Sequence, residues 1–140
     1  MTNYTSFTKE TWSAFASDDR PGPIHMLNLI RLRDRADYQD GRSATGMDAY
    51  SEYSRVSAPV LKRLGGRIVW RGGFELMMVG PSVEVWDICF IAEYPSVEAF
   101  SEMMRDPVYR EAMTHRQAGV KDSRLIRFSR QSAGSVFDQG

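Results

Sequence analysis

Two stretches of the chain carry apolar residues on both faces of an extended strand. Residues Ile24 to Leu32 alternate so that both sides are largely apolar, and Asn28 interrupts one of them. The stretch from Val83 to Tyr94 has the same character. Runs of this kind are typical of strands that are covered on both faces. We therefore predict two long strands at the centre of a sheet.

Two shorter strands complete the expected sheet. Arg67 to Arg71 alternates polar and apolar residues between two glycine pairs, and Lys121 to Gln131 contains a further apolar run. The first glycine pair follows a helical pattern, which suits the left-handed residue at a helix C-terminus. A phosphate-binding loop would instead place its glycines between a strand and the start of a helix. The glycine pairs therefore predict turns.

The longest helical pattern runs from Gly46 to Leu64. Its apolar residues recur at helical spacing, and Ser43 or Thr45 is suited to cap its start. Pro59 lies inside the pattern, so we expect a kink or a split into two helices. The polar stretch before it, residues 33–45, is predicted to be a long loop.

Two further helices are predicted beyond the central strands, and one before them. Ser96 is a suitable cap for a helix to about Met104, and Asp106-Pro107 begins another towards Val120. Near the N-terminus, Ser6 or Thr8 is suited to cap a short helix through Phe15. The aromatic residues of that extension indicate that it packs onto another surface, such as a partner subunit.

The expected order of elements is β, α, β, β, α, α, β after an N-terminal extension. This is the split βαβ arrangement of an α+β, ferredoxin-like sandwich with an antiparallel sheet. We assign residues 1–22 to the extension, 23–131 to the domain and 132–140 to a tail in which Val136 and Phe137 are able to dock. In this fold helices cover one face of the sheet. Because the strands are apolar on both faces, we expect the second face to meet another copy of the chain in a homodimeric barrel.

Composition narrows the function classes. The 140 residues suit a single domain, and 18 basic residues balance 18 acidic ones, so we expect no nucleic-acid partner. Cys89 is the single cysteine, which excludes an intramolecular disulfide and fits a cytoplasmic protein. No signal peptide is apparent and no run of about 18 apolar residues occurs, so no membrane association is expected.

Several short motifs occur together in a fixed order. They are Gly65-Gly66-Arg67, Arg71-Gly72-Gly73, Tyr94-Pro95-Ser96-Val97-Glu98-Ala99, Asp106-Pro107-Val108-Tyr109 and Arg116. In this order they resemble domain-of-unknown-function family 1330 of the dimeric α/β-barrel superfamily, over residues 24–130. The resemblance implies a ferredoxin-like protomer whose sheet faces that of a partner, and it implies no activity. The family usually has an acidic residue beside the glycine before the third strand, whereas this chain has Met78-Val79-Gly80-Pro81.

His115 and Arg116 form the strongest candidate catalytic pair. A histidine is able to shuttle a proton near neutral pH, and an arginine is able to hold a carboxylate or enolate. The alternative is that both lie on a solvated helix face. His25 is interpreted as a core or interface residue. Two histidines and one cysteine without ligand spacing predict no metal site, and we expect no cofactor.

A polar and aromatic set is expected to line a cleft between the sheet and the long helix. Its members are Asn28, Tyr50, Tyr53, Trp70 and Trp86. Related dimeric α/β-barrel families include cofactor-free oxygenases of aromatic substrates and haem-degrading enzymes, whose clefts are similar in type. Packing in the core is the alternative for these aromatic residues.

Three functions remain open at this point. The first is a small-molecule-binding homodimer, with cofactor-independent catalysis on a small acidic or aromatic metabolite as an extension of it. The second is a non-catalytic dimeric module, and the third is a haem-binding monooxygenase. The charged residues on the strands, Asp87, Glu93, Arg67, Arg71 and Arg127, suit either a network between two sheets or a floor that binds an anion.

Overall fold

The computed structural model describes residues 2–134, which contain one antiparallel four-stranded sheet. Its strands lie in the order β2-β3-β1-β4, the order of a ferredoxin-like sandwich. The strands are β1 (Ile24–Leu32), β2 (Arg67–Gly72), β3 (Ile88–Tyr94) and β4 (Val120–Phe128). The α+β fold class predicted from the sequence is therefore confirmed. Val136 and Phe137 lie outside the described residues.

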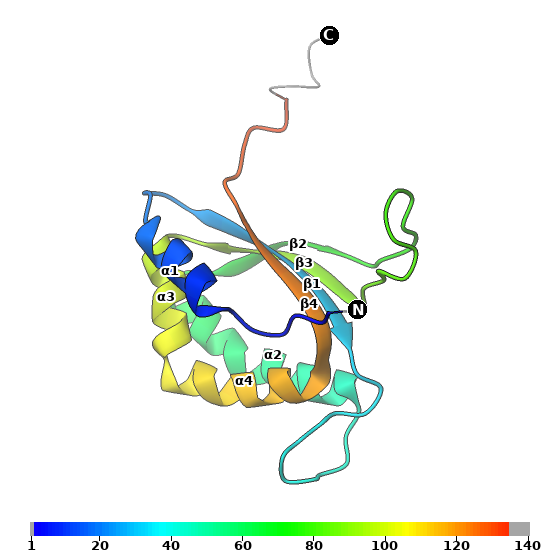
Figure 1. Cartoon of the computed structure of the whole chain (residues 1–140). Coiled ribbons are helices and arrows are strands. Elements are labelled where there is room, and N and C mark those ends of the chain that lie inside the picture. Colours follow the sequence, from blue (N-terminus) through cyan, green and yellow to red (C-terminus); the bar gives the residue numbers. More distant parts are fainter. Residues whose placement is uncertain (1, 135–140) are drawn as a thin grey trace.

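Helices cover one face of this sheet. They are α1 (Lys9–Ser17), α2 (Gly46–Arg63), α3 (Val97–Arg105) and α4 (Pro107–Gly119). Figure 1 shows α2, α3 and α4 beneath the sheet, with α1 beside α3 at the end of the layer. In residues 2–134 no helix covers the other face, which we call the open face.

Local signals account for the helix starts. Thr8, Thr45, Ser96 and Asp106 each accept a hydrogen bond at the start of their helix, and Thr45 forms a reciprocal capping box with Asp48. At Pro59 a kink or a split of the long helix was predicted, and the split is wrong, because α2 is continuous through this residue. Pro59 is exposed, so water can satisfy the carbonyl that a proline leaves without a donor.

The predicted strand from Val83 is too long, because β3 begins only at Ile88. Just before β3, Asp87 forms hydrogen bonds between β1 and the chain that leads into β3. Its backbone N–H donates to the carbonyl of Ile30 at 2.8 Å, and its carboxylate accepts from the N–H of Leu32 at 2.7 Å. A side chain thus takes the place of the next backbone pair in the ladder.

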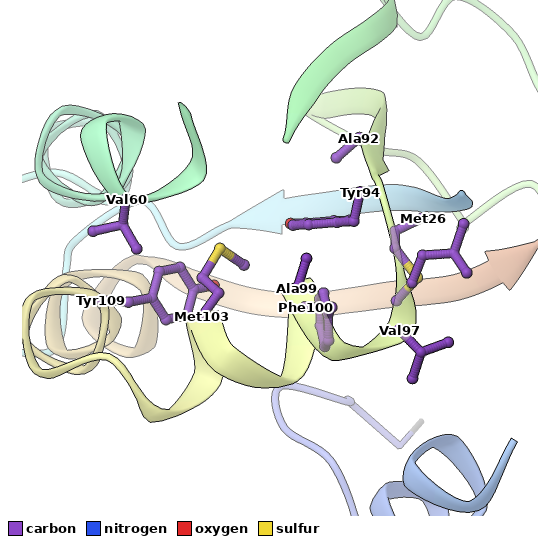
Figure 2. Packing of buried hydrophobic residues seen from close by; sticks show 10 residues of the cluster. Met26, Val60, Ala92, Tyr94, Val97, Ala99, Phe100, Met103 and Tyr109 are labelled. Carbon is purple, nitrogen blue, oxygen red and sulfur yellow. The ribbon is translucent and has the colours of Figure 1, made fainter. Parts of the chain in front are cut away.

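The main core lies between the sheet and the helices (Figure 2). Strands β1 and β3 contribute Ile24, Met26, Ala92 and Tyr94, all less than 9% exposed. The helices contribute Val60, Val97, Ala99, Phe100, Met103 and Tyr109 to the same cluster. Figure 2 shows Tyr94 and Phe100 directed into the layer between strand and helix, which positions the aromatic residues of the site described next.

Candidate functional site

A cavity of about 360 Å³ lies between the sheet, helix α4 and the N-terminal segment Tyr4–Thr8. We call it the central cavity. Its size falls in the range of small-molecule sites. The lining combines apolar and aromatic side chains with a few polar ones, the most informative being Asn28, Tyr53, Phe100, Tyr109, Met113, Arg116 and Leu125.

The N-terminal segment is attached to β4 on one side of this cavity. The backbone N–H of Tyr4 donates to Asp122 at 2.8 Å, and the hydroxyl of Ser123 donates to the Tyr4 carbonyl at 2.7 Å. The Arg124 guanidinium lies 5.0 Å from the centre of the Tyr4 ring. Although burial of Asp122 opposes the shift, the hydrogen bonds from Tyr4 and Arg124 lower the pKa of its carboxyl.

The same segment is attached to α4 on the other side. The carbonyl of Thr5 accepts from Arg116 at 3.3 Å and from Gln117 at 3.1 Å. In Figure 1 the dark blue chain accordingly crosses between β4 and α4 before it reaches α1. The segment therefore roofs the central cavity.

Arg116 is the one cationic side chain from the helices that lines this cavity in the described chain. Arg116 is 9% exposed, and the bond to the Thr5 carbonyl is the only hydrogen bond that its guanidinium makes within residues 2–134. No carboxylate within that range pairs with it. A buried guanidinium normally has an anionic partner, because desolvation of an unpaired charge is costly. The remaining N–H donors of Arg116 are thus available to an anion in the cavity.

Tyrosines supply neutral polar groups beside this cation. The hydroxyls of Tyr53 and Tyr109 lie 2.8 Å apart, and the rings of Tyr50 and Tyr53 are 5.2 Å apart. Burial raises the pKa of Tyr50, Tyr94 and Tyr109 above the ordinary value of a phenol. All three hydroxyls are therefore protonated near neutral pH and act as hydrogen-bonding groups.

Asn28 is the polar residue that interrupts the helix-facing side of β1, and it lines the central cavity. Its amide nitrogen donates to the carbonyl of Met26 at 3.1 Å. Its side-chain oxygen accepts no hydrogen bond from any residue in the range 2–134. This oxygen is available to a hydroxyl or amide of a ligand.

The structure brings together only part of the predicted site. Asn28, Tyr53 and Arg116 line the central cavity. Tyr50 packs against Tyr53 but lines a neighbouring groove between α2 and the β2–β3 edge. Trp86 lies outside the cavity, where its ring centre is 5.2 Å from the guanidinium of Arg124.

Trp70 lies on the opposite side of the sheet from the cavity. A β-bulge between Ile68 and Trp70 pairs Ile68 with Ala92 and Trp70 with Ile91. Paired residues of antiparallel strands share a face, so the bulge turns Trp70 to the open face, where it is 50% exposed. The expectation that Trp70 contacts a ligand in the cleft depended on uninterrupted alternation, and the bulge removes that basis.

His115 and Arg116 also diverge. Adjacent helical residues point about 100° apart, and only Arg116 reaches the central cavity. The Nδ1 atom of His115 forms a 2.7 Å hydrogen bond with the hydroxyl of Tyr38, in the loop before α2. The two side chains therefore do not converge on one cavity.

The N-terminal segment was not predicted to form part of the site. Its aromatic residues were expected to pack onto another surface, and they pack onto their own chain. Phe7 and Phe15 lie 6.3 Å and 5.0 Å from the ring of Phe100. The sequence feature that could have indicated this packing is the number of aromatic residues before the first strand. No local pattern shows which surface they pack against.

The charged strand residues that the sequence pointed to do not all lie on the same face of the sheet. Glu93 accepts from His25 at 2.8 Å and from Arg67 at 3.0 Å on the open face, and chiefly the bond from His25 lowers the pKa of Glu93. Arg127 instead lies on the helix-facing side, paired in register with Met26. The charges therefore form no single network.

Between residues 2 and 134 no group of three histidine, cysteine, aspartate or glutamate side chains is placed to hold a metal ion. Within the same range no helix has the length and apolar character needed to cross a membrane.

The fold and the site define a ferredoxin-like α+β protein with a cavity between its sheet and its helices. Residues 42–127 match the family described as Domain of unknown function (DUF1330), and the chain belongs to this family. This match confirms the resemblance drawn from the glycine and proline motifs. A comparison with curated proteins finds no match.

Solved structures extend the likeness beyond the family match. The crystal structure of methylated RPA0582 protein shares 61% identity, covers 96% of this chain and 99% of its own, and superposes with a TM-score of 0.94. A second structure of RPA0582, a protein of unknown function from Rhodopseudomonas palustris, shares 60% identity. It covers 94% of this chain and 99% of its own, with a TM-score of 0.91.

Proposed function

We propose that this protein binds a small organic acid in the central cavity. The observation that carries the proposal is the buried Arg116, which has no carboxylate partner in residues 2–134 and lines a cavity of about 360 Å³. A ligand carboxylate would supply the missing charge and form charge-assisted hydrogen bonds. The aromatic and apolar walls suit a ligand with an apolar body, such as a ring.

The polar groups of the cavity suggest how such a ligand is oriented. The carboxylate lies at Arg116, and the apolar body packs against Phe100 and Leu125. The hydroxyl pair of Tyr53 and Tyr109 and the oxygen of Asn28 receive any further polar group. Because His115 bonds with Tyr38 and does not line the cavity, the geometry favours binding over a proton transfer by His115.

The binding test uses matched ligands and matched variants. Benzoate and phenylacetate are titrated into the full chain beside benzamide, which keeps the ring without the charge. We expect the acids to raise the melting temperature and to give a binding isotherm, and benzamide to do neither. Arg116→Met removes the response, whereas Arg110→Met, an exposed arginine on the same helix, retains it. Equal responses to acid and amide would contradict the proposal.

We also propose that two copies associate through the open face. Support comes from its exposed apolar residues, with Trp70, Ile126 and Phe128 at 50%, 42% and 49% exposure. An isologous contact would remove these side chains from water. Sedimentation at micromolar concentration should give twice the chain mass of 15.9 kDa, and a monomer would contradict this proposal.

A further inference from the structure

A second cavity of about 280 Å³ lies beside the central one, beneath α1. The two share four wall residues, Phe7, Thr11, Phe100 and Leu125. The second cavity ends at Arg127 and is otherwise mainly apolar, with Trp12, Phe15 and Met26 among its walls. The two cavities adjoin at these four residues, three of which are apolar, so the space along them is mainly apolar where they meet.

Strand β4 provides the floor of this space. Leu125 and Arg127 lie on its helix-facing side, where they pair in register with Asn28 and Met26 of β1. The chain from Tyr4 to Phe15 runs along the same strand, because Tyr4 bonds to Ser123 and Phe15 lies beside Arg127. The distance from Ser123 to Arg127 is four residues of strand, or about 13 Å between Cα atoms.

Arg127 is incompletely paired. Its Nη2 atom is buried and makes no hydrogen bond. The closest acid is Asp18, whose carboxylate oxygen lies 3.8 Å away on a side chain that is 70% exposed. The guanidinium also lies 5.1 Å from the centre of the Phe15 ring. The same Nη2 atom faces Asp18, but at 3.8 Å the two groups form an ion pair without a hydrogen bond. A buried charged donor without a hydrogen bond is rare in proteins, so this nitrogen is open to a further acid group.

We infer that the ligand is an elongated organic acid with two acid groups, one held by Arg116 and the other by Arg127, joined by an apolar body along Leu125 and Phe100. This inference rests on the proposed function, because the first acid group is the one placed at Arg116. Arg127 is then the residue that distinguishes a diacid from a monoacid. The apolar walls shared by the two cavities enclose the middle of the molecule.

The test compares each diacid with its own monomethyl ester, which has the same length and one charge fewer. Hexanedioate, octanedioate, decanedioate and para-carboxycinnamate are titrated calorimetrically into the full chain, each beside its monoester. We expect at least one diacid to bind about tenfold more tightly than its monoester. Arg127→Met should abolish that difference and leave the affinity for the monoester unchanged. Arg127→Lys should retain part of the difference, and Asp18→Asn should retain all of it.

The outcomes separate this inference from the proposed function. If monoesters bind through Arg116 but no diacid binds more tightly, the two-acid inference is wrong and the single-acid site stands. If Arg127→Met weakens diacid and monoester equally, Arg127 only supports the structure and the inference is again wrong. If neither diacids nor monoesters bind, the proposed function fails as well. The wild-type comparison of diacid and monoester decides the matter even if Arg127→Met does not fold.

Discussion

Replacing Arg116 with methionine should remove ligand binding without lowering the stability of the protein. The change keeps a long, unbranched side chain and removes the charged group. If the guanidinium is present to hold a ligand, the empty protein bears the cost of burying it. If the guanidinium is structural, the same change should destabilise the fold. The sign of the stability change therefore distinguishes the two roles.

The contacts of the Arg116 guanidinium determine the size of the expected change in stability. Arg116 loses one hydrogen bond, 3.3 Å long, to the carbonyl of Thr5, which costs about 1 kcal/mol. That carbonyl retains Gln117 at 3.1 Å, so no acceptor is left without a donor. Removing the buried charge also removes its desolvation cost, which should stabilise the fold by about 1 to 2 kcal/mol, since apolar replacement of buried charges is often neutral or stabilising. This gain offsets the lost hydrogen bond. We expect a change between zero and about 1 kcal/mol of added stability.

Urea denaturation followed by circular dichroism measures the free energy of unfolding, and calorimetry with benzoate measures binding. Arg124→Met is the matched control. The guanidinium of Arg124 lies 2.8 Å from the carboxylate of Asp122, whose side chain is 5% exposed. Its removal leaves a buried carboxylate short of a partner and should cost about 2 kcal/mol. Of the two variants, only Arg124→Met should therefore lose stability.

A fall of more than about 1.5 kcal/mol in the stability of Arg116→Met would refute this reasoning. Such a result would mean that the empty protein already satisfies the guanidinium. Retained benzoate affinity in a stable Arg116→Met variant would be equally damaging, because the acid would then bind elsewhere.

Three further predictions follow from single contacts. Gly119→Ala should destabilise the protein by about 1 to 3 kcal/mol, measured by urea denaturation, because the new Cβ would lie 2.7 Å from the carbonyl oxygen of Gly46. The control Gly73→Ala, where the new Cβ has open space around it, should be neutral. Asp122→Asn should cost stability at neutral pH. Since the folded pKa of Asp122 is lowered, its contribution is fully present above its unfolded pKa of about 3.8. The contribution is lost as the pH falls through the lower folded value, so the deficit of the variant should shrink there, and a deficit independent of pH would argue against the assignment. Ile126→Lys, on the open face, should shift sedimentation from dimer to monomer while the melting curve of the monomer remains cooperative.

The elements of this protein follow from patterns that extend over a few residues. Each helix cap bonds to a backbone group two or three positions ahead, as Ser96 does with Ala99, so the signal and its partner lie in one window of sequence. The apolar periods of β1 and α2 likewise reflect faces that a short stretch defines. The order of these elements then leads to the ferredoxin-like topology, because few arrangements of a split βαβ unit exist.

The site depends on contacts between distant parts of the chain, and there the sequence predicts only some members. Asn28 was singled out because it interrupts an apolar face, and Arg116 because it forms a polar pair with His115 in the sequence; the structure places both at the central cavity. Trp70 was misplaced by a single extra residue in β2, which no local pattern reveals. His115 was paired with Arg116 by adjacency, although neighbouring positions on a helix point in different directions.

The sequence by itself determined the helices, the strands, their order and the residues suited to the core. Only the tertiary structure decided that Tyr4 bonds to Asp122, 118 positions away, and that the N-terminal segment therefore closes a cavity at Arg116. The physical reason is the distance along the chain over which each kind of interaction acts. Hydrogen bonds and side-chain periods within a turn or a strand act locally, whereas a cavity is formed where surfaces from separate elements fail to fill the space between them.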